Sequence, residues 1–288
     1  MKRLPALILL AAGCDPSLLV PRYMQDAPRS EEDARRVTEE IRRELGPETR
    51  VELVEDIFFM ASNDTARSFD RSKGTVAWVY RNLNRDFLGR KPAKPIRVFL
   101  FRDRQTYEEY CKASYKKAPS TPFGFYMAHE RKMVMNISTG LGTLAHEMVH
   151  PLVAEDFPSI PSWFNEGFAS LYEQSGERGG RMVGFVNWRL RGLQKALREG
   201  KGVPLPELLK TTTEQFYGDE RGIHYATARY LCLYLQETDR LVEYYKAFRA
   251  ASGEDPTGAA TLEKVAGKKM GELDKAWQEW ALRLRLED

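Results

Sequence analysis

Histidine and cysteine are scarce in this 288-residue chain, which has four histidines and three cysteines. Cys111 and Cys232 have no histidine or second cysteine close by in the sequence, which excludes a zinc-thiolate site of the usual spacing. Outside the cytosol these two thiols either pair with each other or stay buried and free in helical segments. The sequence leaves both alternatives open.

Long apolar runs and an excess of charge of one sign are also missing. No stretch reaches the ~20 apolar residues of a membrane-spanning helix, and the net charge is only +3. Nucleic-acid binding usually needs a concentrated basic face, so we expect no nucleic-acid partner. What the chain does have is 42% apolar and 11% aromatic residues, without repeats or low-complexity tracts. This composition is typical of a packed globular enzyme of one or two domains.

The N-terminus has the pattern of an export signal. A basic start, Met1–Arg3, precedes a short apolar run over residues 4–12 and the junction Gly13-Cys14. This arrangement resembles a bacterial lipoprotein signal, cleaved before Cys14 and lipidated on its thiol, although Ala11 stands where Leu is commoner. We therefore expect a lipid anchor in a bacterial membrane, on the periplasmic side or at the cell surface. An ordinary secretory signal is the alternative.

Residues 14–30 are polar and proline-containing, as in a tether. Strand patterns follow at 51–60, 96–101, 123–127 and 133–137. Helix patterns lie at 31–45, 65–88, 103–115, 143–154, 162–174, 185–199, 206–210, 222–237, 239–251, 257–266 and 270–285. Because strands come early and helices late, the sequence predicts an α+β fold: a small mixed sheet in the N-terminal half, packed on a mostly helical C-terminal half. The active-site cleft is expected between the two.

The most specific feature of the chain is the segment His146-Glu147-Met148-Val149-His150. Residues four apart lie on one face of a helix, with Cβ atoms about 5–6 Å apart, so both imidazoles can reach one zinc ion. Glu147 can reach a water on that zinc without being a ligand, and accept its proton as general base. A surface helix with two incidental histidines is the alternative.

Glu166 is the candidate third ligand, because catalytic zinc keeps three protein ligands and one open position. A proline-containing turn separates its helix from the histidines and can bring it opposite them. Its sequence neighbours are large and apolar, and a carboxylate among them is unfavourable unless it is paired: Trp163, Phe164, Phe168 and Leu171. The alternative is that Glu166 points to solvent near a helix start, where acids are favoured.

Two segments carry a family resemblance: residues 146–150 and Trp163-Phe164-Asn165-Glu166-Gly167-Phe168-Ala169. Both resemble the gluzincin metallopeptidases, particularly the peptidase MA-like group. The likeness extends more loosely over roughly residues 50–285, through 124–126, 133–136, 142–145, 224–231 and 267–282. It implies a zincin-like domain over 31–288, with a sheet-containing part at about 50–155 and a helical part at about 156–288. It also implies Zn²⁺ held by His146, His150 and Glu166.

The resemblance implies further roles. Gluzincins place a Tyr or His over the developing oxyanion, where Tyr225, next to His224, matches best; a tyrosine of the helix core is the alternative. Met133 to Ile137 would be the strand at the cleft edge that pairs with an extended substrate. Many gluzincins carry an acid four residues after the glutamate ligand, and here Ser170 stands there. Glu173 or a backbone carbonyl would then have to orient a zinc histidine.

The sequence thus predicts a lipid-anchored zinc peptidase that hydrolyses peptide or protein substrates, with Glu147 as general base and Tyr225 as a second catalytic residue. Two other hypotheses stay open. One is a non-catalytic envelope lipoprotein that keeps the fold as a binding module, against which the complete set of ligands and Glu147 argue. The other is a zinc hydrolase of a non-peptide amide, which the metal ligands alone do not distinguish from a peptidase.

Overall fold

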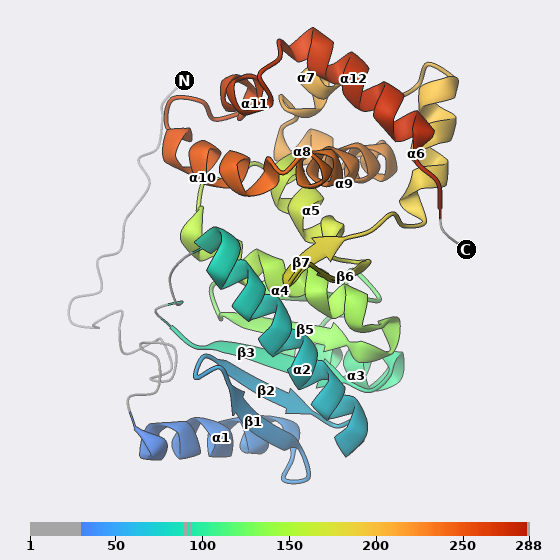
Figure 1. The fold of residues 1–288 in the computed structure, drawn as a ribbon. Helices are drawn as coiled ribbons and strands as arrows, with labels where there is room; N and C mark the ends of the chain where they lie inside the picture. The colour runs from blue at the N-terminus through green and yellow to red at the C-terminus, as the bar shows by residue number, and fades with distance from the viewer. Residues whose placement is uncertain (1–29, 89–91, 93, 287–288) are drawn as a thin grey trace, which may run out of the picture.

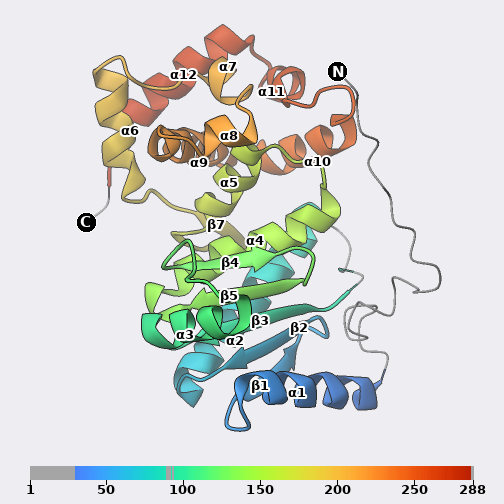
Figure 2. The same ribbon diagram turned by 180° about the vertical axis from the view of Figure 1, so that it is seen from behind.

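The computed structural model describes residues 30–88, 92 and 94–286 (Figures 1 and 2). Cys14, the expected signal peptide and nearly all of the expected tether lie outside these residues. Within the described part of the chain, no helix has the length and apolar character needed to cross a membrane. The N-terminal half contains α1 (Glu31–Leu45), β1 (Arg50–Val54), β2 (Phe58–Ser62), α2 (Ala66–Leu83), the π-helix η3 (Asn84–Leu88), β3 (Ile96–Phe101), α3 (Arg104–Tyr115), β4 (Gly124–Met127), β5 (Lys132–Asn136), the 3-10 helix η4 (Ile137–Thr139) and α4 (Leu141–Asp156).

The C-terminal half is mostly helical. It contains α5 (Ser162–Leu171), β6 (Ser175–Arg178), β7 (Arg181–Gly184), α6 (Arg189–Arg198), α7 (Leu205–Leu208), α8 (Thr213–Phe216), α9 (Arg221–Glu237), α10 (Leu241–Ala251), α11 (Ala259–Ala266) and α12 (Met270–Arg283). In Figure 1 these helices lie above the sheet and its covering helices, and α5 reaches down towards α4.

The five-stranded sheet has the order β1-β2-β3-β5-β4. The two outer pairs, β1–β2 and β4–β5, are antiparallel, and the inner strands β2, β3 and β5 run parallel. The structure therefore confirms the α+β class and the small mixed sheet in the N-terminal half.

Both faces of the sheet are covered, because successive side chains of a strand point to opposite faces. In β2, Phe58 and Met60 join the core that contains residues of α2 and α4, whereas Phe59 and Ala61 join a second core with residues of α1 and α3. The same alternation holds in β3 and β5. Near-continuous apolar strands are expected for a sheet buried on both faces. Helix α4, which carries His146 and His150, packs on the same face of the sheet as α2.

The single strand expected at 51–60 is wrong. The chain turns between β1 and β2 at Glu55 and Asp56, which both have a φ of 53°, and the N–H of Ile57 donates to the carbonyl of Val54. Two central residues with positive φ match the right-handed twist of the flanking strands in a tight hairpin. Asp56 tolerates this backbone, and Glu55-Asp56 is the one pair of adjacent polar residues within 51–60.

Two more boundaries differ from expectation after α4. The helix expected over 162–174 ends at Leu171, because the buried guanidinium of Arg229 donates to the carbonyl oxygens of Ser170 and Leu171. Residues 175–184, for which the sequence predicted no element, form the hairpin β6–β7, and its turn is Gly179-Gly180, both with positive φ. A Gly-Gly pair between short alternating segments is a hairpin signal.

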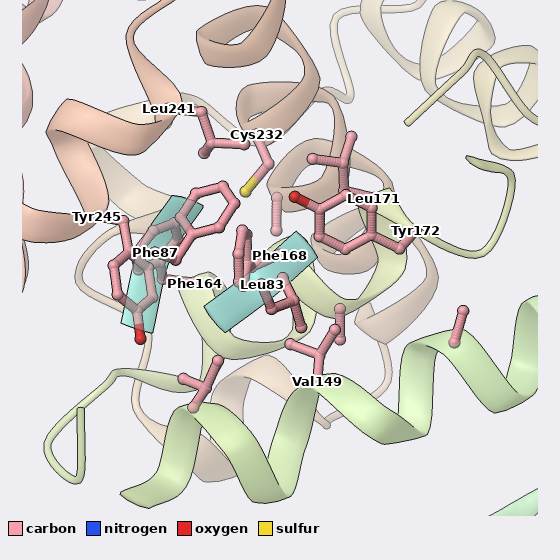
Figure 3. Packing of buried hydrophobic residues seen from close by; sticks show 14 of the residues in the cluster. Leu83, Phe87, Val149, Phe164, Phe168, Leu171, Tyr172, Cys232, Leu241 and Tyr245 are labelled. Carbon is pink, nitrogen blue, oxygen red and sulfur yellow. The ribbon is translucent and has the colours of Figure 1, made fainter. Parts of the chain in front are cut away.

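An aromatic core joins the two halves (Figure 3). The ring of Phe168 in α5 lies 4.8 Å from that of Phe87 in the π-helix and 5.4 Å from that of Tyr245 in α10. Cys232 lies in the same core, and Cys111 lies in the core beneath α1 and α3. Both cysteines are buried and free, which answers the question that the sequence left open.

Candidate metal centre

The helix α4 has one apolar face and one polar face at the centre of the molecule. The apolar face packs against α2 and the sheet through Leu144, Ala145, Met148, Val149 and Leu152, all of them buried. His146, Glu147 and His150 are half-buried on the other side. Pro151 lies inside the helix and has no N–H, so the carbonyl of Glu147 lacks its helical hydrogen bond there.

Glu166 reaches the histidines from α5, which packs closely on α9. The contact depends on Gly167, the next residue: a Cβ atom there would lie 2.7 Å from the carbonyl oxygen of Ala228. A side chain at this position would push α5 away from α9. The glycine therefore sets the depth at which Glu166 enters the site.

Replacing Gly167 with alanine is expected to lower the free energy of unfolding by about 1–3 kcal/mol, because the added methyl group overpacks the contact between α5 and α9. It should also weaken zinc binding, since Glu166 moves with α5. Urea unfolding and a zinc titration measure the two effects. Gly222→Ala is the matched control, because no atom lies within 4 Å of the added Cβ in α9. Equal effects of the two substitutions would contradict this account of the helix contact.

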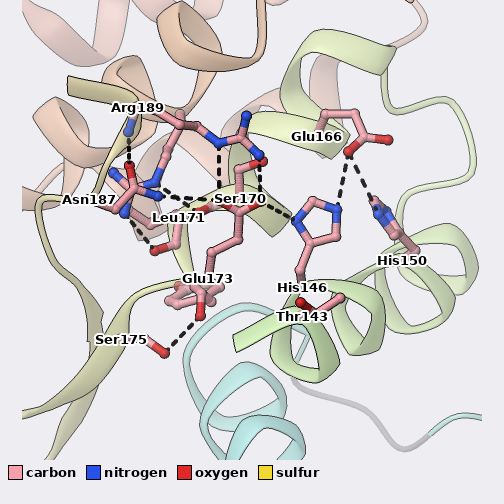
Figure 4. A network of polar contacts seen from close by, with 12 residues as sticks. Thr143, His146, His150, Glu166, Ser170, Leu171, Glu173, Ser175, Asn187 and Arg189 are labelled. Carbon is pink, nitrogen blue, oxygen red and sulfur yellow. Dashed lines mark hydrogen bonds and ion pairs between the residues drawn. The ribbon is translucent and has the colours of Figure 1, made fainter. Parts of the chain in front are cut away.

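The three expected ligands meet (Figure 4). One donor atom each from His146, His150 and Glu166 lies within 4.8 Å of the other two. Oε2 of Glu166 is 3.3 Å from Nε2 of His146 and 3.8 Å from Nε2 of His150. Ligands at about 2.0–2.2 Å from a tetrahedral zinc ion lie about 3.4 Å apart, so the spacing fits that ion.

Glu166 gives a second sign that the group is built for a cation. Its residue is only 6% exposed, and its Oε2 is buried without a hydrogen bond. Its contacts with the two imidazoles are ion pairs at 3.3 and 3.8 Å, and burying a carboxylate without good hydrogen bonds costs on the order of several kcal/mol. A metal ion between this oxygen and the two imidazoles would remove that cost.

Comparison with known proteins adds no relative. No protein-family model matches the chain, and no curated protein matches it. The assignment of the site therefore depends on the residues and their geometry.

A polar network beside His146 fills the place of the missing acid at Ser170 (Figure 4). Nδ1 of His146 lies 3.4 Å from Oε1 of Glu173, an ion pair longer than a good hydrogen bond. Glu173 in turn accepts hydrogen bonds from both Nε and Nη2 of Arg189 and from Nδ2 of Asn187. Glu173 was one of the two substitutes expected from the sequence, and it lies beside His146, in the turn after α5.

A close backbone approach brings Glu173 to this position. A Cβ atom on Gly142, in the first turn of α4, would lie 2.1 Å from the carbonyl oxygen of Glu173. Only glycine permits this approach. It brings the turn after α5 against the start of the helix that carries His146.

His150 has its own outer partner. Its Nδ1 lies 3.1 Å from Oδ1 of Asn165. When Nδ1–H donates to this amide oxygen, Nε2 keeps its lone pair and faces Glu166. Both imidazoles thus present Nε2 to the same space, as two ligands of one ion must.

The charges of the metal-free group are strongly coupled. Burial favours the neutral imidazole of His146, but the carboxylates of Glu166 and Glu173 outweigh it and raise the pKa of His146 to about 10. Burial likewise favours the protonated acids, yet His146 and its partners lower the pKa of Glu166 and that of Glu173 to about 2. Both carboxylates are therefore ionised at neutral pH, whereas His146 is protonated in the metal-free group, and a metal ion would have to displace its Nε2 proton to bind there.

Replacing Glu173 with alanine is expected to weaken zinc binding about 10–100-fold, the usual effect of removing a residue that orients a metal ligand. The imidazole of His146 would lose its ion pair and Arg189 its carboxylate. Competition with a colorimetric chelator measures the affinity. Glu177→Ala, an exposed position in β6, is the control. An unchanged zinc affinity in Glu173→Ala would show that Glu173 does not orient His146.

Tyrosine side chains complete the surroundings of Glu166. The hydroxyl of Tyr217, the residue after α8, donates to Oε1 of Glu166 at 2.6 Å. Tyr225 of α9 is half-buried, and its ring centroid is 6.3 Å from that of Tyr217. Burial and the charge of Glu166 raise the pKa of Tyr225 above its ordinary value, so its hydroxyl stays a donor. His224 turns away, donating from Nδ1 to the carbonyl of Phe216.

Sequence reasoning missed Tyr217 because it missed α8. The signal was present: Thr212 and Gln215 form a capping box, in which each side chain bonds the backbone of the other. The pattern Thr-x-x-Gln marks a helix start. A single turn of helix is too short, however, to show an apolar period.

The expectation that Met133 to Ile137 forms the cleft edge is wrong. β5 pairs with β3 on one side and with β4 on the other, so its backbone is not open to a substrate. The outer strand is β4, and α4 packs against it. The sequence indicated the β4–β5 hairpin. It did not indicate that β3 would pair with β5 rather than with β4, and this pairing leaves β4 as the outer strand.

Proposed function

We propose that this protein is a zinc-dependent peptidase of the gluzincin type. One observation carries the proposal: the buried Oε2 of Glu166 has no hydrogen bond and lies between the two imidazoles, 3.3 Å from Nε2 of His146 and 3.8 Å from Nε2 of His150, a spacing that fits a tetrahedral ion. Two histidines and one carboxylate leave one position open, which is the arrangement of catalytic rather than structural zinc sites. When bound, zinc supplies a Lewis acid that makes water more acidic and polarises a carbonyl group.

The chain's own residues would supply the rest of the chemistry. Glu147 neighbours His146 but does not belong to the ligand group, so its carboxylate is available to accept the proton of the attacking water and to pass it to the leaving amine. Tyr225 keeps its hydroxyl proton and is assigned to donate a hydrogen bond to the carbonyl oxygen as negative charge develops there.

The outer strand β4 favours a peptide over another amide as substrate. Of its two edges, one pairs with β5, and among the described strands none pairs with the other. An extended peptide can add to such an edge through main-chain hydrogen bonds. Because α4 packs against β4, a peptide bound there would pass close to the metal group.

Hydrolysis of a peptide library by the purified protein, with and without a metal chelator, tests the proposal. We expect cleavage that the chelator abolishes and that added zinc restores. Zinc binding without cleavage of any peptide would instead point to a hydrolase of another amide. A folded protein that neither binds zinc nor cleaves peptides would leave only a binding module.

A further inference from the structure

The two carboxylate oxygens of Glu166 have different partners. Oε1 accepts the hydrogen bond of Tyr217 at 2.6 Å. Oε2 has no hydrogen bond and faces Nε2 of both histidines. Oε2 of the carboxylate therefore faces the space between the imidazoles, and Oε1 is hydrogen-bonded to Tyr217.

The hydroxyl of Tyr217 is fixed in this position by several contacts of the short α8 segment. The capping box of Thr212 and Gln215 starts the helix, and Thr213 lies 3.0 Å, Oγ1 to Oγ, from Ser162 at the start of α5. Phe216 is fully buried beside it, and its carbonyl accepts the bond from His224. The segment is thus tied both to α5, which carries Glu166, and to α9.

We propose that Tyr217 is a positioning residue that holds Glu166 as a metal ligand through one oxygen only. This inference rests on the proposed zinc site. A carboxylate can bind a metal ion through one oxygen or through both, and a short hydrogen bond to Oε1 favours the first mode because it occupies that oxygen. Zinc in a catalytic site then keeps its fourth position for water and substrate. Partners of this kind around a ligand set both its orientation and the metal affinity.

The position of Tyr217 at the protein surface suits this role. The residue is 42% exposed and Glu166 is buried, so its hydrogen bond reaches from the protein surface to the buried carboxylate. Tyr225, the tyrosine expected from the sequence, packs its ring against Phe216, with the centroids 5.2 Å apart, and Glu166 acts on its hydroxyl as well.

Tyr217→Phe tests the proposal, because it removes only the hydroxyl and keeps the ring and its packing. We expect zinc affinity, measured by competition with a chelator, to fall about 10–100-fold. In the Co²⁺-substituted protein, the visible absorption should also lose intensity, because binding through both oxygens raises the coordination number above four. A role in folding alone would not change that spectrum.

Tyr234→Phe is the matched control. Tyr234 is a half-buried tyrosine of α9 whose ring packs edge-on against Trp280 of α12, and its variant should keep the zinc affinity and the Co²⁺ spectrum of the wild type. Unchanged affinity and an unchanged spectrum in Tyr217→Phe would overturn the positioning role while leaving the proposed function in place. An equal loss of affinity in both variants would overturn it as well. Failure of the wild type to bind zinc would overturn both proposals.

Discussion

Replacing Glu147 with glutamine should lower peptide turnover about 10²–10⁴-fold while zinc stays bound. The substitution keeps the size and shape of the side chain and removes only the group that accepts the proton of the attacking water. The expected loss corresponds to about 3–5 kcal/mol of transition-state stabilisation. His146, His150 and Glu166 are untouched, so zinc content by elemental analysis should match that of the wild type.

A second glutamate-to-glutamine substitution shows whether the effect is specific. Glu177 is exposed in β6, outside the metal group and its network, and Glu177→Gln should keep full turnover. If Glu147→Gln also kept full turnover with zinc bound, another residue would have to be the general base.

Replacing His150 with alanine should remove the metal and with it all metal-dependent activity. Two protein ligands do not hold zinc in a catalytic geometry, and the substitution also frees Asn165 from its contact with Nδ1. His150 is the sharper choice of the two histidines, because His146 also takes part in the network of Glu173 and Arg189. Elemental analysis should then find almost no zinc in a protein that is still folded.

The control for His150→Ala is His129→Ala. His129 lies in the turn between β4 and β5, and its side chain is 79% exposed. This variant should keep both zinc and activity. A His150→Ala protein with the zinc content of the wild type would mean that the imidazole of His150 is not a ligand.

The local parts of this fold could be read from the sequence. Helical periodicity predicts a helix with His146 and His150 on one face. The cost of burying an unpaired acid indicates that Glu166, among large apolar residues on the following helix, has a partner. The side chains of Phe58, Phe59 and their neighbours point alternately to the two faces of the sheet. This pattern indicates a sheet covered on both faces, but only once the strands have been located. The class α+β follows from the order of the segments.

What the sequence could not show depends on contacts between distant segments. The end of α5 is set by Arg229, some sixty residues later in the chain. The order of strands places β4 rather than β5 at the sheet edge, and strand order follows from long-range pairing that no local pattern records. Arg189 and Tyr217 have no motif of their own, and become informative only once Glu173 and Glu166 are seen beside them.

The zinc content of the purified wild-type protein tests the account most directly. We expect elemental analysis to find about one zinc ion per chain, removable by a chelator and restored by added zinc, as the ligand group of His146, His150 and Glu166 requires. A folded wild-type protein that holds no zinc and binds none when it is added would contradict the account at its centre.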